Sequence, residues 1–239
     1  MNMGKSNINY IQYGKGEDVV LLHGWGQNIE MMKPLGDRII DKRITIIDFP
    51  GFGNSPEPDS VWTIDDYVNS LECLVKELKI KNPILIGHSF GGRVSIKYAS
   101  KNKVNKVILF GSPCVRTMRK STKEKVLKTL KRLPLMNNLG EYMKKYIGSD
   151  DYKNASPLMR NILVNVVNED LSEDAKMITV PTLLVWGSLD TAAPLEDAKK
   201  LENLLPDGGL VVIDGCTHYA YLEALDYVSN IVNNFLEVK

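Results

Sequence analysis

The feature that most constrains this chain is a set of short, uninterrupted aliphatic runs spaced along its length. A strand with one face in water alternates apolar and polar residues, whereas a strand buried on both faces does not. The runs are far too short to cross a membrane, and they suit the buried strands of a parallel sheet. They are Val19–Leu22, Ile44–Ile47, Ile84–Ile86, Val107–Phe110, Leu183–Trp186 and Leu210–Ile213.

Helical patterns lie between most of these runs. Apolar residues recur at intervals of three and four over residues 64–78. Thr63 can cap the start of this helix, and Asp66 can complete a capping box by accepting from the Thr63 N–H. A similar pattern covers residues 222–235. This alternation of strands and helices predicts an α/β fold, with a doubly wound, mostly parallel sheet and right-handed crossovers.

Residues 113–177 interrupt the alternation, because they contain no solid aliphatic run. Helical patterns fill the interval instead, at 126–133, 139–147 and 158–167. The last of them opens with Ser156 as a cap and Pro157 at the first helical position. We therefore predict one core, formed by residues 1–112 and 178–239, with a helical lid inserted at 113–177.

Composition sets the broad class of protein. The net charge of +1 gives no basic surplus for nucleic acid, and no apolar signal segment opens the chain. The three cysteines are odd in number and lack paired spacing, so neither a disulfide framework nor a metal site is expected. We expect a cytoplasmic protein without stable membrane insertion, metal or organic cofactor.

The segment Gly87-His88-Ser89-Phe90-Gly91 is a G-x-S-x-G motif, placed directly after a predicted strand and before a helical pattern. In this context the motif is a nucleophile elbow. The serine takes a strained positive φ, so the residues two before and two after it come too close for side chains. We therefore predict that Ser89 is a nucleophile.

A serine nucleophile needs a base, and the chain offers three histidines. His88 adjoins Ser89 on a tight turn, points away from it and is expected to pack. His23 follows an early strand and is expected to brace its loop through ring hydrogen bonds. His218, after the last strand, is the predicted base.

The acid that orients the base is expected between Ser89 and His218 in the chain. Asp190 lies just past the run Leu183–Trp186 and leaves room for one helix and one strand before the histidine. Asp214 is only four residues from His218 and is interpreted as loop structure. Asp190 therefore completes the predicted triad.

An oxyanion hole requires two backbone N–H groups aimed at the developing charge. One comes from the residue after the nucleophile, Phe90. The other is expected from the loop "HGWG" after an early strand, with Trp25 as the donor. The predicted substrate pocket adds the Trp25 side chain and three lid residues, Met118, Leu130 and Tyr142.

These segments together resemble the α/β-hydrolase fold superfamily over nearly the whole chain. "LLHGWG", "DFPGFGNS", "IGHSFGGR", "VPTLLVWGSLDTAAP" and "GCTHY" stand in the family's order and spacing. The resemblance implies a serine hydrolase with the triad Ser89, Asp190 and His218, similar to the carboxylesterase branch, which includes carrier-bound methyl-ester esterases. Serine at the nucleophile position argues against the dehalogenase and epoxide-hydrolase branches.

The expected activity is hydrolysis of carboxylic esters with small or medium acyl groups through an acyl-enzyme. Two enzymatic alternatives remain: a lyase or C–C bond hydrolase with the same triad, and an esterase acting on a carrier-protein-bound acyl ester. A ligand receptor on the same fold is the alternative outside enzymes, although such a role does not require an intact triad.

The predicted lid carries an uneven charge. Residues 115–147 hold ten basic side chains against two acidic ones, a net of +8, so the rest of the chain carries −7. Three interpretations stay open: a solvated outer face of amphipathic helices, a docking patch for an acidic carrier protein or an anionic substrate, and a membrane-surface role.

A docking patch would make turnover of an anionic substrate sensitive to salt. Steering by surface charge is screened over about 8 Å at physiological ionic strength. We expect kcat/KM for a carboxylate-bearing or carrier-bound ester to fall with salt more than that of a neutral ester. The combined Lys128→Glu, Lys131→Glu and Arg132→Glu variant should lose that difference. Equal salt dependence of both substrates in both proteins would identify a solvated face.

Overall fold

The computed structural model describes residues 6–114 and 155–237. The described residues form a seven-stranded sheet in the order β1-β3-β2-β4-β5-β6-β7. All neighbouring pairs are parallel except β1 and β3, which are antiparallel. The strands are β1 (Asn9–Gly14), β2 (Glu17–Leu22), β3 (Lys42–Asp48), β4 (Ile84–His88), β5 (Lys106–Phe110), β6 (Thr182–Gly187) and β7 (Gly208–Ile213).

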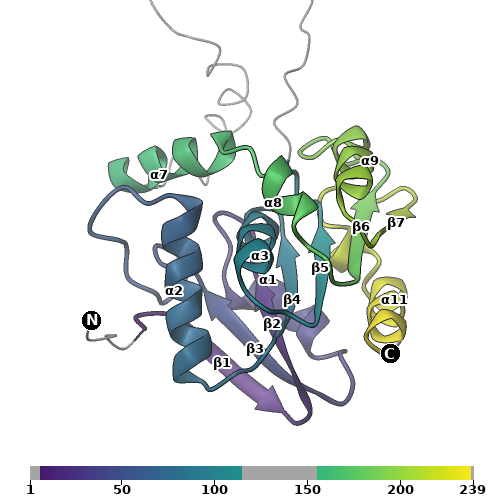
Figure 1. Ribbon diagram of the computed structural model, residues 1–239, viewed down its shortest axis with the longest axis horizontal. Helices are drawn as coiled ribbons and strands as arrows, with labels where there is room; N and C mark the ends of the chain where they lie inside the picture. Colours follow the sequence, from purple (N-terminus) through teal and green to yellow (C-terminus); the bar gives the residue numbers. More distant parts are fainter. Residues whose placement is uncertain (1–5, 115–154, 238–239) are drawn as a thin grey trace, which may run out of the picture.

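The fold is the predicted doubly wound α/β sheet, and each of the six aliphatic runs lies in a strand. Helices cover both faces of this sheet (Figure 1). One face packs against α2 (Ile64–Glu77), α3 (Phe90–Lys101) and α9 (Leu195–Leu204). The other packs against α1 (Ile29–Gly36), α10 (Ala220–Glu223) and α11 (Leu225–Glu237).

Strand β2 shows why the runs do not alternate. Val20 and Leu22 belong to the core under α2 and α3, whereas Val19 and Leu21 belong to the core under α1 and α11. All four side chains are at most 1% exposed. Burial of aliphatic surface on both faces, at about 25 cal/mol per Å², fixes these strands in the middle of the sheet.

Of the two predicted core helices, one forms as its pattern indicates and the other is divided. The capping box of α2 forms as expected, since Thr63 Oγ1 accepts from the Asp66 N–H and the Asp66 carboxylate accepts from the Thr63 N–H. The pattern at 222–235 is divided between α10 and α11, because the chain leaves helical geometry at Ala224. The sequence missed β1, whose polar alternation is that of an edge strand.

The segment between β5 and β6 was predicted to be a lid. Its described part contains α7 (Pro157–Asn168), capped by Ser156 as expected, and α8 (Ser172–Lys176). Both lie beyond one end of α2 and α3 in Figure 1. The helical patterns at 126–133 and 139–147 fall outside the described residues, so the boundaries of the lid stay a prediction.

Arg93 of α3 joins this segment to the core. The guanidinium is buried and donates to the carbonyl oxygens of Pro113 (2.6 Å), Val166 (3.0 Å) and Glu169. Pro113 follows β5, whereas Val166 and Glu169 lie at the end of α7. One side chain therefore holds the end of α7 against the residues that follow β5.

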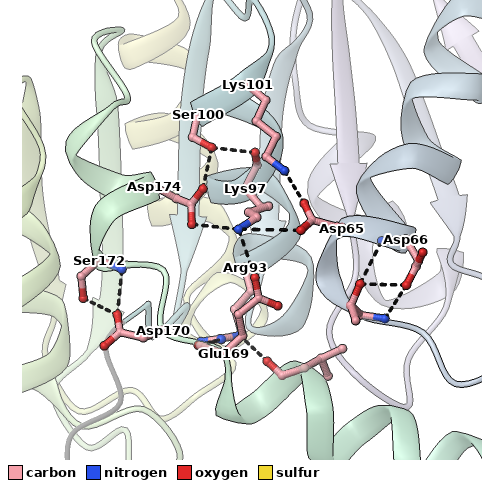
Figure 2. A network of polar contacts seen from close by, with 12 residues as sticks. Asp65, Asp66, Arg93, Lys97, Ser100, Lys101, Glu169, Asp170, Ser172 and Asp174 are labelled. Atoms are coloured by element: carbon pink, nitrogen blue, oxygen red, sulfur yellow. Dashed lines mark hydrogen bonds and ion pairs between the residues drawn. The ribbon is translucent and has the colours of Figure 1, made fainter.

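Lys97, one turn further along α3, is the centre of an ionic cluster (Figure 2). Its Nζ lies 3.1 Å from both Glu169 and Asp174 and 4.0 Å from Asp65. Burial pulls the pKa of Lys97 down, but hydrogen bonds to Glu169 and Asp174 outweigh it and raise the pKa. The cluster joins α3 to α2, to α8 and to the end of α7.

Lys97→Met should destabilise the fold by about 3 kcal/mol, because it leaves several partly buried carboxylates without their cation. Lys76→Met is the matched control, since the Lys76–Glu72 ion pair is exposed and its loss should cost less than about 1 kcal/mol. Urea unfolding at neutral pH measures both changes. Equal losses in the two variants would show that the Lys97 cluster does not stabilise the fold.

Candidate active site

The order of the strands reverses between β2 and β4, which places a switch point at their carboxyl ends. The chain proceeds from β2 toward one sheet edge through β3, and from β4 toward the other through β5. Helix α1, which follows β2, and helix α3, which follows β4, pack on opposite faces of the sheet. Ligand sites in open α/β sheets lie at such switch points. The loop from His23 to Gln27 and the turn at Ser89 both begin here.

Ser89 occupies a strained turn between β4 and α3. Its φ is +50°, a left-handed value that a non-glycine residue rarely adopts. A Cβ on Gly87 would lie 2.6 Å from backbone atoms of Gly91, and one on Gly91 would lie 2.2 Å from the carbonyl oxygen of Leu22. Only glycine fits at both places, so the serine side chain is presented at the end of the sheet.

Asp190 and His218 are paired at the ends of β6 and β7. His218 Nδ1 lies 2.7 Å from Asp190 Oδ2, and the aspartate side chain is fully buried. The other carboxylate oxygen accepts from the N–H groups of Ala192 and Ala193 at 2.7 and 2.8 Å. With Nδ1–H donated to the carboxylate, the Nε2 lone pair of the imidazole is available for a proton.

The Asp190–His218 pair lies beside the elbow, across Gly111. The Ser89 N–H donates to the carbonyl oxygen of Phe110 at 2.9 Å. Gly111 follows Phe110 in the chain, and a Cβ on Gly111 would lie 2.9 Å from His218 Nδ1 and 3.2 Å from Asp190 Oδ2. Among the described residues, Ser89 and His218 do not form a hydrogen bond. In enzymes such a bond often tightens only when substrate binds.

His23 braces the loop that starts at the end of β2, as the sequence predicted. Its Nδ1–H donates to the Gly24 carbonyl (2.7 Å), and Nε2 accepts from the Phe49 N–H (2.9 Å). Complete burial lowers the pKa of His23 to about 4. The ring is therefore neutral, and the loop carrying Trp25 is joined to the loop after β3.

The two predicted oxyanion donors lie close together. The rings of Trp25 and Phe90 are 5.4 Å apart, centroid to centroid. Within the described part of the chain, neither backbone N–H donates a hydrogen bond to protein. Phe90 is also the first residue of α3, where N–H groups and the helix dipole favour an anion.

A hollow of about 220 Å³ adjoins the loop from His23 to Gln27. Its wall includes Trp25, Phe52, Glu57 and Met159, so the first turn of α7 contributes to it. The carboxylate of Glu57 accepts from Ser156 Oγ at 2.9 Å. The predicted pocket residues Met118, Leu130 and Tyr142 lie outside the described residues, and Trp25 is the one the structure places in this hollow.

Sequence reasoning missed two groups that organise the site. The buried Asp48 carboxylate accepts from the N–H groups of Ile29 (2.8 Å) and Asn54 (2.9 Å), which sets the loop after β3 against α1. His88, expected only to pack, also contacts the His218 carbonyl and the Gln27 side chain. The position of Asp48 at the end of a predicted strand was the available signal.

No described helix is long and apolar enough to span a bilayer. No group of three or more His, Cys, Asp or Glu side chains in residues 6–114 and 155–237 could hold a metal ion.

Comparisons with known proteins match this architecture. The profile of the α/β hydrolase fold family matches residues 19–139, and a TAP-like protein profile matches residues 163–238. The chain is 24% identical to AB hydrolase superfamily protein YisY of Bacillus subtilis, covering 93% of this chain and 92% of that protein. It is 27% identical to pimeloyl-[acyl-carrier protein] methyl ester esterase of Shewanella woodyi, covering 84% and 85%.

Among solved structures, an esterase from Exiguobacterium antarcticum superposes with a TM-score of 0.77. The superposition covers 97% of this chain and 96% of the esterase, at 23% sequence identity. At that identity the likeness shows the fold.

Acid should unfold the protein partly through His23. The unfolded imidazole titrates near its ordinary value of about 6.5, whereas burial holds the folded pKa at about 4. Between pH ~6.5 and pH ~4 the unfolded state binds a proton on His23 that the folded state does not bind. The free energy of unfolding therefore falls as the pH drops below the unfolded pKa. We expect His23 to contribute a loss of about 3 kcal/mol between neutral pH and pH ~4.

His23→Asn isolates this contribution, because the carboxylates that also titrate in acid are unchanged. Urea unfolding of both proteins across that range should give a shallower pH dependence for the variant, by up to about 1.4 kcal/mol per pH unit. Parallel curves for the two proteins would contradict the role of His23.

Proposed function

The chain belongs to the α/β hydrolase fold family, and from that premise we propose that it is a serine hydrolase of carboxylic esters. One observation carries the proposal: an Asp190–His218 pair, 2.7 Å apart, beside a serine at φ +50°. A strained serine next to an oriented imidazole is the arrangement that acyl transfer requires.

In the proposed mechanism Ser89 attacks the ester carbonyl while His218 Nε2 removes the hydroxyl proton. Asp190 keeps the imidazole in the Nδ1–H tautomer and stabilises the cation that forms. The amides of Trp25 and Phe90 bind the oxyanion of the tetrahedral intermediate. His218 then protonates the leaving alcohol, and water repeats the same steps on the acyl-enzyme.

The proposed substrates carry small or medium acyl groups. The hollow beside Trp25, about 220 Å³ among the described residues, is the proposed site of the acyl group. Trp25 and Phe52 pack edge to face at 4.8 Å and give this space an apolar wall. Met118, Leu130 and Tyr142 remain the proposed lid contacts.

A carrier-bound acyl ester is the second candidate substrate. The excess of basic residues in 115–147 would attract an acidic carrier protein. The similarity to an enzyme named for a pimeloyl-[acyl-carrier protein] methyl ester supports the same candidate.

Turnover of p-nitrophenyl esters and labelling by a fluorophosphonate test the proposal. Ser89→Ala should remove labelling and lower kcat by about 10⁴-fold or more, because no nucleophile remains. Asp190→Asn should lower kcat by a comparable factor, because the imidazole then takes the wrong tautomer. Ser60→Ala, at an exposed serine, is the matched control and should keep both labelling and turnover.

Labelling of the Ser89→Ala protein at wild-type rate would contradict the assignment. Labelling of Ser89 without ester turnover, together with cleavage of a carbon–carbon bond in a diketone substrate, would favour the C–C bond hydrolase. A folded wild-type protein with neither labelling nor turnover would favour a receptor.

A further inference from the structure

His88 lies between the two loops that supply the reacting groups. Its side chain is fully buried. Nε2 lies 3.0 Å from the carbonyl oxygen of His218, and Nδ1 lies 3.2 Å from Gln27 Oε1. The same Gln27 oxygen accepts from the Gly24 N–H at 2.9 Å. One imidazole thus contacts the loop of the predicted base and, through Gln27, the loop of Trp25.

The protons of this cluster can be assigned from its chemistry. Burial lowers the pKa of His88 well below its ordinary value, so the ring is neutral and carries one N–H. A carbonyl oxygen only accepts, so the 3.0 Å contact with His218 places that hydrogen on Nε2. Nδ1 is then an acceptor and requires a donor from Gln27.

Gln27 carries such a donor on its side-chain amide. Its amide carries both an acceptor oxygen and a donor nitrogen, and the two are assigned by their hydrogen bonds. A Cβ on Gly24 would lie 3.1 Å from Gln27 Nε2 and 2.8 Å from His88 Nδ1, so these groups converge on one point. In the structure Oε1 faces both the Gly24 N–H and His88 Nδ1, so a hydrogen bond to Nδ1 requires the amide to turn and present Nε2.

The ring of His88 has little freedom to move. Aromatic side chains surround it, with centroids 4.8 Å away for His218, 5.3 Å for Tyr219 and 5.0 Å for Tyr221. The backbone of Gly24 also packs against the ring, so closely that a Cβ at this position would clash with it. A group held this firmly transmits the position of one loop to the other.

We infer that His88, together with Gln27, is a positioning residue that sets the distance between the His218 imidazole and the oxyanion amide of Trp25. This role rests on the proposed function. Proton transfer and oxyanion binding must be aligned in the same transition state, and a misplacement of about 1 Å can cost 100-fold in rate. Loss of the cluster should therefore lower kcat and leave KM nearly unchanged.

Three substitutions at position 88 separate the two contacts. His88→Gln places an amide near the former Nε2 and can still donate to the His218 carbonyl. His88→Asn reaches only the Gln27 side, and His88→Phe fills the space without hydrogen bonds. We expect kcat to fall by about 10- to 100-fold in the Phe and Asn variants and less than about 5-fold in the Gln variant, with KM within about twofold.

Tyr221→Phe is the matched control. Its ring packs on His88, and its hydroxyl has no hydrogen-bond partner among the described residues, so its removal should leave kcat and KM unchanged. Thermal unfolding of each variant separates loss of fold from loss of rate. If the His88→Phe protein does not fold, Gln27→Leu at the half-buried end of the cluster should lower kcat in the same selective way.

Two outcomes would overturn the inference. One is a folded His88→Phe or Gln27→Leu protein with wild-type kcat, and the other is a His88→Gln protein no better than His88→Phe. Histidine ¹⁵N NMR of the unmodified protein gives a readout that needs no substrate: we expect the Nε2–H tautomer of His88 at neutral pH. An Nδ1–H tautomer would refute the contact with His218 even if the protein proved not to be an esterase.

Discussion

The close contact between the serine turn and the end of β2 is the constraint on which the rest of the site depends. Gly91 lies so near the Leu22 carbonyl that a Cβ there would be 2.2 Å from the oxygen. This approach brings the first turn of α3 against the start of the loop that carries Trp25. Any side chain at Gly91 would push Ser89, the proposed nucleophile, away from the loop that carries Trp25, a proposed oxyanion donor.

Buried polar side chains hold the loops in place around that contact. His23 joins the loop after β2 to the loop after β3, and Asp48 joins the loop after β3 to α1. One carboxylate oxygen of Asp190 accepts from an N–H of its own turn, and the other contacts His218. Each group is buried and hydrogen-bonded, and leaving such a group unpaired costs about 1–3 kcal/mol. The loops are therefore rigid although they are not regular structure.

The sequence predicts the parts of this protein whose causes are local. Solid aliphatic runs identify the central strands, Thr63 and Asp66 identify the start of α2, and two glycines around Ser89 identify the elbow. Strand β1 was missed because its burial alternates and it pairs with β3 alone. The role of His88 was missed because its partners are 130 and 61 residues away in the chain.

The groups proposed for chemistry and those proposed for substrate choice lie on different kinds of structure. Ser89, Asp190 and His218 follow the ends of central strands, where the sheet fixes positions to the accuracy that proton transfer requires. Apart from Trp25 and Phe52, the proposed substrate contacts come from residues between β5 and β6. Arg93 connects the two regions: its N–H bonds the Ser89 carbonyl at 3.2 Å, while its guanidinium holds Pro113 and Val166. The segment can therefore vary in sequence while its attachment stays one helical turn from Ser89.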